Sequence, residues 1–137
     1  MGQWDKGDGS PCPTVHLYKG ECVMKELEIE SKFRIKIHGE KVFGEGPCIL
    51  LEKIDKLGSL SKACEDLNMS YSKGWSIINN AEALLNVKLI ETKIGGADGG
   101  GSYLTEDGKK LIRAYRDFTL EAEKNIGEIF KKHFDKI

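Results

Sequence analysis

The sequence predicts a mainly α-helical protein with a small amount of β structure. Apolar residues recur with helical spacing over most of the chain from Cys48 onward, and the few β-prone runs are short and occur in pairs around glycine. A length of 137 residues suits one domain with an accessory element. Because no apolar run approaches the roughly 20 residues needed to cross a bilayer, we expect a cytoplasmic protein.

The segment from Ser59 to Asn86 predicts two helices joined by a tight turn. Ala63 and Cys64 are small residues at a point where a second helix must approach closely. Asn68 stands at the turn, and asparagine tolerates the left-handed conformation that a turn there requires. Ser70 can accept a hydrogen bond from the first N–H groups of the second helix. This pattern is typical of a helix-turn-helix.

The second helix of this pair has an apolar stripe and an opposite polar face. Helical spacing predicts that the buried stripe comprises Gly74, Ile77, Ile78, Ala81, Leu84 and Leu85. The outer face comprises Ser72, Ser76, Asn79 and Ala83, with Lys73, Trp75 and Asn80 on its flanks. Such a face can read base edges in a major groove, or it can be an ordinary solvated surface. Trp75 can contact the DNA sugar-phosphate backbone or pack on the preceding helix, and packing is favoured because an exposed tryptophan is costly.

Two β-prone runs after Asn86 flank a glycine-rich tip, Gly95 to Gly101, and predict a β-hairpin of the kind called a wing. Glycine allows the backbone of such a tip to lie close to a phosphate backbone. The alternative, a nucleotide phosphate loop, requires a Lys-Ser/Thr pair and a helix at the end of the loop. Ser102-Tyr103 offers neither.

A second hairpin and a scaffold helix are expected upstream. Phe33, Ile35 and Ile37 alternate with polar residues and predict a half-buried strand, which turns at Gly39-Glu40 into a partner over Lys41 to Phe43. The basic residues of this hairpin, Arg34, Lys36 and Lys41, contact DNA or a partner subunit, or are simply solvated. A helix is then expected from Gly46-Pro47 to the C-cap residue Gly58, with an apolar stripe of Ile49, Leu50, Ile54 and Leu57.

The C-terminal segment, residues 105–137, predicts one long helix from the N-cap Thr105 to about His133. Its apolar stripe is wider than one small domain needs, so we expect a dimerisation helix. The stripe consists of Leu111, Tyr115, Phe118, Ala122 and Ile129, widened by Ile112, Ile126 and Phe130. The alternative is a helix that folds back along its own domain.

Residues 1–31 are expected to be a flexible leader, of which residues 1–23 read as a leader peptide or a cloning-derived arm, and residues 32–104 the folded domain. Cys12, His16 and Cys22 lack the close-paired spacing of zinc ligands. Cys48 and Cys64 are expected to be small apolar helix residues. We therefore predict no metal, no disulfide framework and no cofactor.

The order helix, turn, helix, strand, glycine tip, strand, long helix resembles the winged helix-turn-helix domain of the molybdate-responsive (ModE-type) transcription regulators and, more distantly, that of the LysR-type regulators. The resemblance covers about Phe33 to Tyr115. It is carried by Gly58-Ser59, Ser70-Tyr71, Trp75, Ile78-Asn79, Gly95-Gly96, Gly99 to Gly101, Leu104-Thr105, Gly108, Leu111-Ile112 and Tyr115. Regulators of this type usually continue into a molybdate-binding domain, whereas this chain ends at Ile137, so a stand-alone form is expected.

The predicted function is sequence-specific binding of double-stranded DNA by a homodimer on a palindromic operator, and the resemblance implies a link to molybdate. Base contacts are expected from Ser72, Lys73, Ser76 and Asn79, and phosphate contacts from Ser70, Tyr71, Lys93 and Ser102. The formal net charge of -1 argues for modest non-specific affinity. The alternative is a winged-helix protein-interaction module. A small-molecule effector is not expected on this chain alone, since no clustered basic pocket is visible, and no pattern of an enzyme active site stands out.

Overall fold

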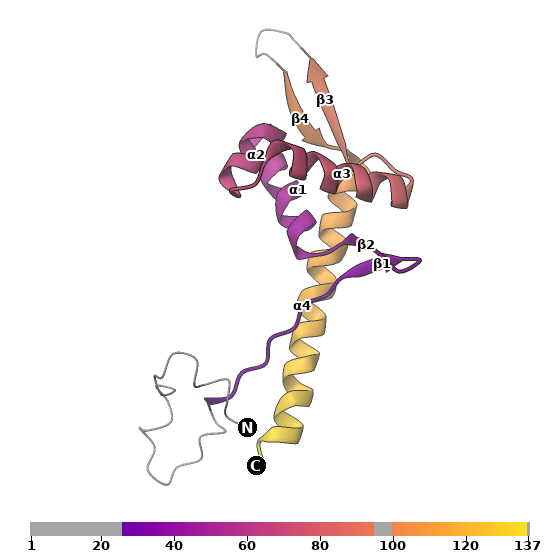
Figure 1. Cartoon of the computed structure of the whole chain (residues 1–137). Helices are drawn as coiled ribbons and strands as arrows, with labels where there is room; N and C mark the ends of the chain where they lie inside the picture. Colours follow the sequence, from indigo (N-terminus) through magenta and orange to yellow (C-terminus); the bar gives the residue numbers. More distant parts are fainter. Residues whose placement is uncertain (1–25, 95–99, 137) are drawn as a thin grey trace. The chain divides into compact units, whose positions relative to one another are not determined.

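The computed structural model describes residues 26–94 and 100–136 (Figure 1). By contacts the chain divides into two compact units, one spanning Lys32–Ala122 and the other containing the described residues 26–31 and 123–136. The first unit has the predicted fold: a mainly helical winged helix-turn-helix with an N-terminal hairpin and the start of a long last helix. Cys12, His16, Cys22 and the wing tip 95–99 lie outside the described residues.

The N-terminal hairpin pairs β1 (Ile35–Ile37) with β2 (Glu40–Phe43) in antiparallel fashion. Its turn is one residue earlier than expected, at His38 and Gly39, whose φ angles of 50° and 84° are both positive. The expected clean alternation was wrong for Ile35, which is 38% exposed, because the register shifts beside it. Phe33 packs edge-on against Phe118, with ring centroids 5.1 Å apart.

The three helices of the domain follow in order: α1 (Glu45–Leu57), α2 (Leu60–Asp66) and α3 (Tyr71–Leu85). The predicted C-cap is confirmed, since Gly58 has φ 70° and its N–H donates to the Ile54 carbonyl. The turn between α2 and α3 is also confirmed: Asn68 is left-handed with φ 56°, and the Ser70 hydroxyl accepts from the Lys73 N–H at 3.1 Å.

Helices α2 and α3 cross in close contact at Gly74. A Cβ atom built there would collide with the Cys64 sulfur and lie 3.6 Å from both Leu60 Cδ1 and Met69 Sδ. Both Gly74 and Cys64 are buried. The absence of a side chain at position 74 therefore sets the distance between the two helices.

The wing pairs β3 (Ile90–Ile94) with β4 (Gly100–Leu104) in antiparallel fashion, as predicted. Of two backbone hydrogen bonds at its base, one joins the wing to the helical body at Gly58 and the other closes the base of the hairpin itself. The Ser102 N–H donates to the Gly58 carbonyl, and the Thr105 N–H donates to the Leu89 carbonyl, both at 3.0 Å. Figure 1 shows the two strands beside the helix-turn-helix.

The last helix, α4, runs over Glu106–Phe134, close to the predicted bounds. Thr105 is its N-cap, since the Thr105 hydroxyl accepts from the Gly108 N–H at 3.0 Å. The core of the first unit lies where α1, α2, α3 and the two hairpins meet the first half of α4. Its fully buried large side chains are Phe43, Leu50, Leu51, Ile54 and Leu89, together with the buried thiols Cys48 and Cys64.

Candidate nucleic-acid interface

The outer face of α3 presents small polar side chains, as its helical spacing predicts. Ser72, Lys73 and Ser76 are exposed, while Asn79 is half-buried. The stripe that faces inward is buried at Gly74, Ile78 and Ala81. This division leaves the outer face free of bulky groups, a shape that suits insertion into a major groove.

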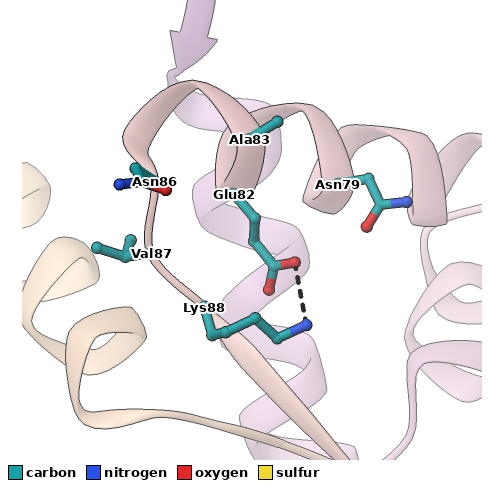
Figure 2. A pocket seen from close by; sticks show the side chains of 6 residues that line it. All are labelled: Asn79, Glu82, Ala83, Asn86, Val87 and Lys88. Atoms are coloured by element: carbon teal, nitrogen blue, oxygen red, sulfur yellow. Dashed lines mark ion pairs between the residues drawn. The ribbon is translucent and has the colours of Figure 1, made fainter.

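Glu82 connects the end of α3 to the start of the wing. Its side chain is only 10% exposed, and its carboxylate accepts hydrogen bonds from the backbone N–H groups of Leu89 at 2.8 Å and Ile90 at 3.2 Å. The second carboxylate oxygen lies 3.5 Å from Lys88 Nζ (Figure 2). Sequence reasoning missed this contact, because a glutamate on a helix is ordinarily a solvated residue.

The exposed side of the wing carries one of the predicted phosphate contacts. Lys93 is exposed, and its ammonium lies 5.5 Å from the centre of the Tyr103 ring, a cation–π distance that holds the charge along the strand. Ile94 is 94% exposed at the end of β3. Ser102 was also predicted to contact phosphate, but its side chain is only 7% exposed.

The amino-acid sequence of this chain is similar to those of several known proteins. A transcriptional dual regulator ModE from Escherichia coli is 38% identical over 90 residues, which is 65% of this chain and 34% of the relative. The molybdenum-pterin-binding protein MopA from Rhodobacter capsulatus is 32% identical over 67% of this chain and 35% of its own length. The molybdenum transport protein ModE from Azotobacter vinelandii is 29% identical over 61% of this chain and 31% of its own length. No protein-family model matches.

The chain carries a ModE-type winged helix-turn-helix domain. It spans about a third of the length of these relatives. Their names describe regulators, a transport protein and a pterin-binding protein rather than enzymes. Among solved structures, ArgP from Mycobacterium tuberculosis aligns with 62% of this chain and 30% of its own, at 22% identity and a TM-score of 0.45.

Within the ModE-type domain, Trp75 departs from the expectation. The side chain was predicted to pack on the preceding helix, yet it is 52% exposed. The corner beneath it is already filled, because Cys64, Leu60 and Met69 surround Gly74 one position earlier. Trp75 therefore stands at the edge of the α3 outer face, beside Thr92 of the wing in a shared hollow.

The predicted dimerisation stripe on α4 divides into core and surface. Tyr115 is 3% exposed, its hydroxyl donates to the Phe33 carbonyl at 2.8 Å, and its ring packs edge-on against Phe43. Its assignment to a dimer face was wrong, because the N-terminal hairpin covers that side of the helix. Leu111 also packs against the core. Phe118, at 50% exposure, and Ile129, at 56%, remain on the surface, and Ala122 is half-buried.

Arg116 attaches α4 to α1 through two carboxylates. Its guanidinium donates to both Glu52 oxygens, at 2.9 and 2.8 Å, and to both Glu45 oxygens, at 3.2 and 3.1 Å. Hydrogen bonding to Arg116 holds the pKa of Glu52 below its ordinary value of 4.5, against a smaller opposing effect of burial. The arginine orients the scaffold rather than the candidate interface.

The basic residues predicted on the N-terminal hairpin lie on its surface. Arg34, Lys36 and Lys41 are exposed on the hairpin, and Asn80 Nδ2 donates to the Lys41 carbonyl at 3.3 Å, which attaches α3 to that hairpin.

Cys48 and Cys64 are buried free thiols, as expected. Among residues 26–94 and 100–136, no group of three His, Cys, Asp or Glu could hold a metal ion. No helix in the same residues is long and apolar enough to cross a membrane.

Proposed function

We propose that the chain is the DNA-binding part of a transcription regulator that binds double-stranded DNA in the cytoplasm, as a homodimer, at a palindromic site. The observation that carries the proposal is the exposed, small-residue face of α3 beside a paired wing, on a domain of ModE type. Because a two-fold dimer presents two such faces, it selects a site with two related halves.

In this proposal α3 enters the major groove and Ser72, Lys73, Ser76 and Asn79 contact bases. An asparagine amide pairs with adenine through two hydrogen bonds, and a serine hydroxyl serves several bases. Ser70, Tyr71 and Lys93 lie where the backbone of the same DNA passes, and Tyr71 and Lys93 are both exposed. The polar contacts of this face compensate for the weak overall charge.

The dimer contact is assigned to the exposed apolar side chains of α4. In the first unit these include Phe118, at 50% exposure, and Leu120, at 68%. In the second unit Ile129 is 56% exposed. Apolar exposure along a long helix is stabilised when a second copy of the helix covers it.

The deciding experiment is selection from a random duplex pool with the purified protein, together with its mass in solution. The proposal predicts an enriched inverted repeat and the mass of a dimer. If no sequence is enriched above a salt-sensitive background, the assignment of α3 to base reading is wrong. A monomeric mass at the concentrations used for binding would remove the dimer from the proposal.

Two variants separate base reading from phosphate attraction. Asn79→Ala should relax preference at one base position by ~1–3 kcal/mol, whereas Lys73→Ala should weaken all sequences alike if its ammonium touches phosphate. Lys110→Ala on α4 removes the same charge away from α3 and is the matched control. Equal losses on every sequence from both α3 variants would contradict the role of Asn79.

The link to molybdate is proposed from the relatives' names, which include a molybdenum transport protein and a molybdenum-pterin-binding protein. It predicts that selected sites lie upstream of genes for molybdenum handling. Direct binding of the oxyanion is not proposed for the described residues. Calorimetry with molybdate on this chain alone should give no heat of binding, and micromolar affinity would overturn that expectation.

A protein-interaction module is the second candidate, because two large apolar side chains are exposed, Trp75 on α3 and Ile94 at the end of β3. Exposed aromatic and aliphatic groups are common anchors of protein interfaces. This candidate predicts that Trp75→Ser leaves duplex binding absent or unchanged while abolishing capture of a defined partner. Loss of duplex binding in the same variant would favour the DNA proposal.

A further inference from the structure

The charged residues before and within β1 change sign at one point of the sequence. Every second residue is charged, first acidic and then basic: Glu26, Glu28 and Glu30, followed by Lys32, Arg34 and Lys36. The residues between them are apolar except at the point where the sign changes: Leu27, Ile29, Ser31, Phe33 and Ile35. We call residues 26–36 the charge-divided segment.

The side chains of the charge-divided segment have few partners among the described residues. Its six charged side chains are exposed, and within residues 26–94 and 100–136 no ion pair includes any of them. Its apolar side chains are also largely outside the core, since Leu27 is 42% exposed, Ile29 49% and Ile35 38%. Exposed apolar side chains that recur beside unpaired charges are typical of a surface that another chain covers.

The backbone of this segment has a free edge. In the described part of the chain β1 pairs only with β2, and the backbone groups of residues 27–32 make no hydrogen bond to another described residue. The Phe33 carbonyl points to the β2 side, where it accepts from the Tyr115 hydroxyl and would lie 3.4 Å from a Cβ atom at Gly44. Successive residues of a strand direct their carbonyls to opposite edges. The carbonyls of Lys32 and Arg34 therefore face the free edge, which is a template for a further strand.

The segment is complementary to a second, antiparallel copy of itself in one register. In that register Ser31 faces Ser31 of the second copy, and residues at equal distances before and after Ser31 lie opposite one another. The charged pairs are Glu30 with Lys32, Glu28 with Arg34, and Glu26 with Lys36; the apolar pairs are Ile29 with Phe33 and Leu27 with Ile35. Cross-strand pairs of opposite charge and of apolar side chains both stabilise a sheet.

The neighbouring registers lack this complementarity. With the two-fold axis at Glu30 or at Lys32, that residue faces its own copy with like charge, which is destabilising. With the axis between two residues, charged side chains lie opposite apolar ones, because a slip of one residue exchanges the faces of a strand. A parallel arrangement in register places every charge opposite the same charge. The pattern therefore selects the axis at Ser31.

We propose that the charge-divided segment pairs with the same segment of a second copy as antiparallel strands, with Ser31 on the two-fold axis. The inference rests on the homodimer of the proposed function and adds a second contact to the one assigned to α4. The ring of Phe33 lies 5.1 Å from that of Phe118, which is 50% exposed. Ile29 of the second copy, opposite Phe33, extends this apolar surface. Backbone hydrogen bonds and apolar pairs supply the affinity, and the exposed charges chiefly fix the register.

The test measures the dimer dissociation constant of the full chain by analytical ultracentrifugation. Glu28→Lys and Arg34→Glu should each raise this constant roughly tenfold to fiftyfold, because each changes two symmetry-related pairs from opposite to like charge. An equimolar mixture of the two variants should restore the dimer, since the lysine at position 28 of one chain then faces the glutamate at position 34 of the other. Glu65→Lys makes the same change of charge on the exposed surface of α2 and should leave the constant unchanged.

A second mixture tests the register. Glu30→Lys mixed with Lys32→Glu should form the dimer, whereas Glu30→Lys mixed with Arg34→Glu should not, because positions 30 and 34 do not face each other when Ser31 is on the axis. Rescue by the second mixture and not by the first would place the axis at Lys32 and overturn the proposal. Circular dichroism of each variant checks that its helices are intact.

Amide hydrogen exchange tests the pairing in the unmodified chain. Protection at the amides of Glu28, Glu30 and Lys32 should increase with protein concentration as the dimer forms, and exchange that stays fast in the dimer would overturn the pairing. If the wild type is a dimer and the charge variants dissociate no more than Glu65→Lys, the inference is wrong while the α4 contact stands. If the wild type is a monomer at all concentrations, this pairing and the homodimer of the proposed function are both wrong.

Discussion

The crossing of α2 and α3 at Gly74 can be tested by replacing Gly74 and Cys64, singly and together, because a side chain at position 74 would occupy the space of the Cys64 sulfur. In Gly74→Ala the new methyl group collides with the Cys64 sulfur. Overpacking of this kind costs about 1–3 kcal/mol, and the better helix propensity of alanine returns about 1 kcal/mol. We expect a net loss of about 0–2 kcal/mol in the free energy of unfolding.

Removing the sulfur should reverse the effect. Cys64→Ala alone loses a buried group and should cost about 1 kcal/mol. In the double variant the methyl group at position 74 occupies the vacated space, at 3.6 Å from Leu60 Cδ1 and Met69 Sδ, which is ordinary van der Waals contact. The double variant should therefore be nearly as stable as the wild type, with a coupling energy of about 2 kcal/mol.

The assay is urea unfolding followed by far-ultraviolet circular dichroism, with the four proteins measured under one set of conditions. Gly46→Ala is a control for the intrinsic preference of alanine, because nothing lies within 4 Å of a Cβ atom at that helical position. Additive losses in the double variant would refute the claim that these two residues share one space. The position of α3 would then depend on other contacts.

Three further outcomes follow from the scaffold. Tyr115→Phe should lower the free energy of unfolding by about 1 kcal/mol, because the hydrogen bond to the Phe33 carbonyl is lost. The mass measured by sedimentation should not change. A change from dimer to monomer would show that Tyr115 takes part in the dimer contact after all. Burial raises the pKa of the Cys48 thiol to about 11 from 9.0. The stability that the protonated thiol contributes should therefore be complete below pH 9 and disappear as the pH rises towards 11. A Cys48→Ala variant whose unfolding keeps the same alkaline pH dependence would contradict this. Arg116→Met should lower the free energy of unfolding by about 1 kcal/mol at neutral pH, since the Arg116–Glu52 ion pair is partly exposed. The loss should be smaller below pH 4.5, where Glu52 takes up a proton on unfolding. A loss that stays constant as the pH falls through this range would exclude the ion pair as its cause.

The sequence predicted the elements well wherever a residue type is tied to a local conformation. Gly58 and Asn68 are left-handed because few other residues adopt positive φ at low cost, and Ser70 caps α3 because its hydroxyl reaches the free N–H groups of its own helix. These preferences act over four residues or fewer. A single sequence is therefore sufficient to recognise them.

The burial of particular side chains was harder to predict, because it depends on which element covers a face. Tyr115 and Phe118 belong to one apolar stripe. Phe43 and the Phe33 carbonyl bury Tyr115 to 3% exposure, whereas Phe118, which meets the Phe33 ring only edge-on, stays 50% exposed. Ser102 alternates correctly in its strand but lies against Gly58, which is 44 positions away in the sequence. Helical and strand periodicity identify a face and leave its partner undetermined.

The carboxylate of Glu82 has a consequence for how tightly a nearly neutral protein can hold a polyanion. With the wing attached to the end of α3 by two hydrogen bonds, from the backbone N–H groups of Leu89 and Ile90 to Glu82, the two surfaces proposed to contact DNA are aligned before any contact. Little conformational freedom at the base of the wing is then lost on association, and the penalty that ordinarily opposes binding is reduced. If the chain binds DNA as proposed, rigidity at this joint adds affinity that a chain of net charge -1 does not obtain from counterion release.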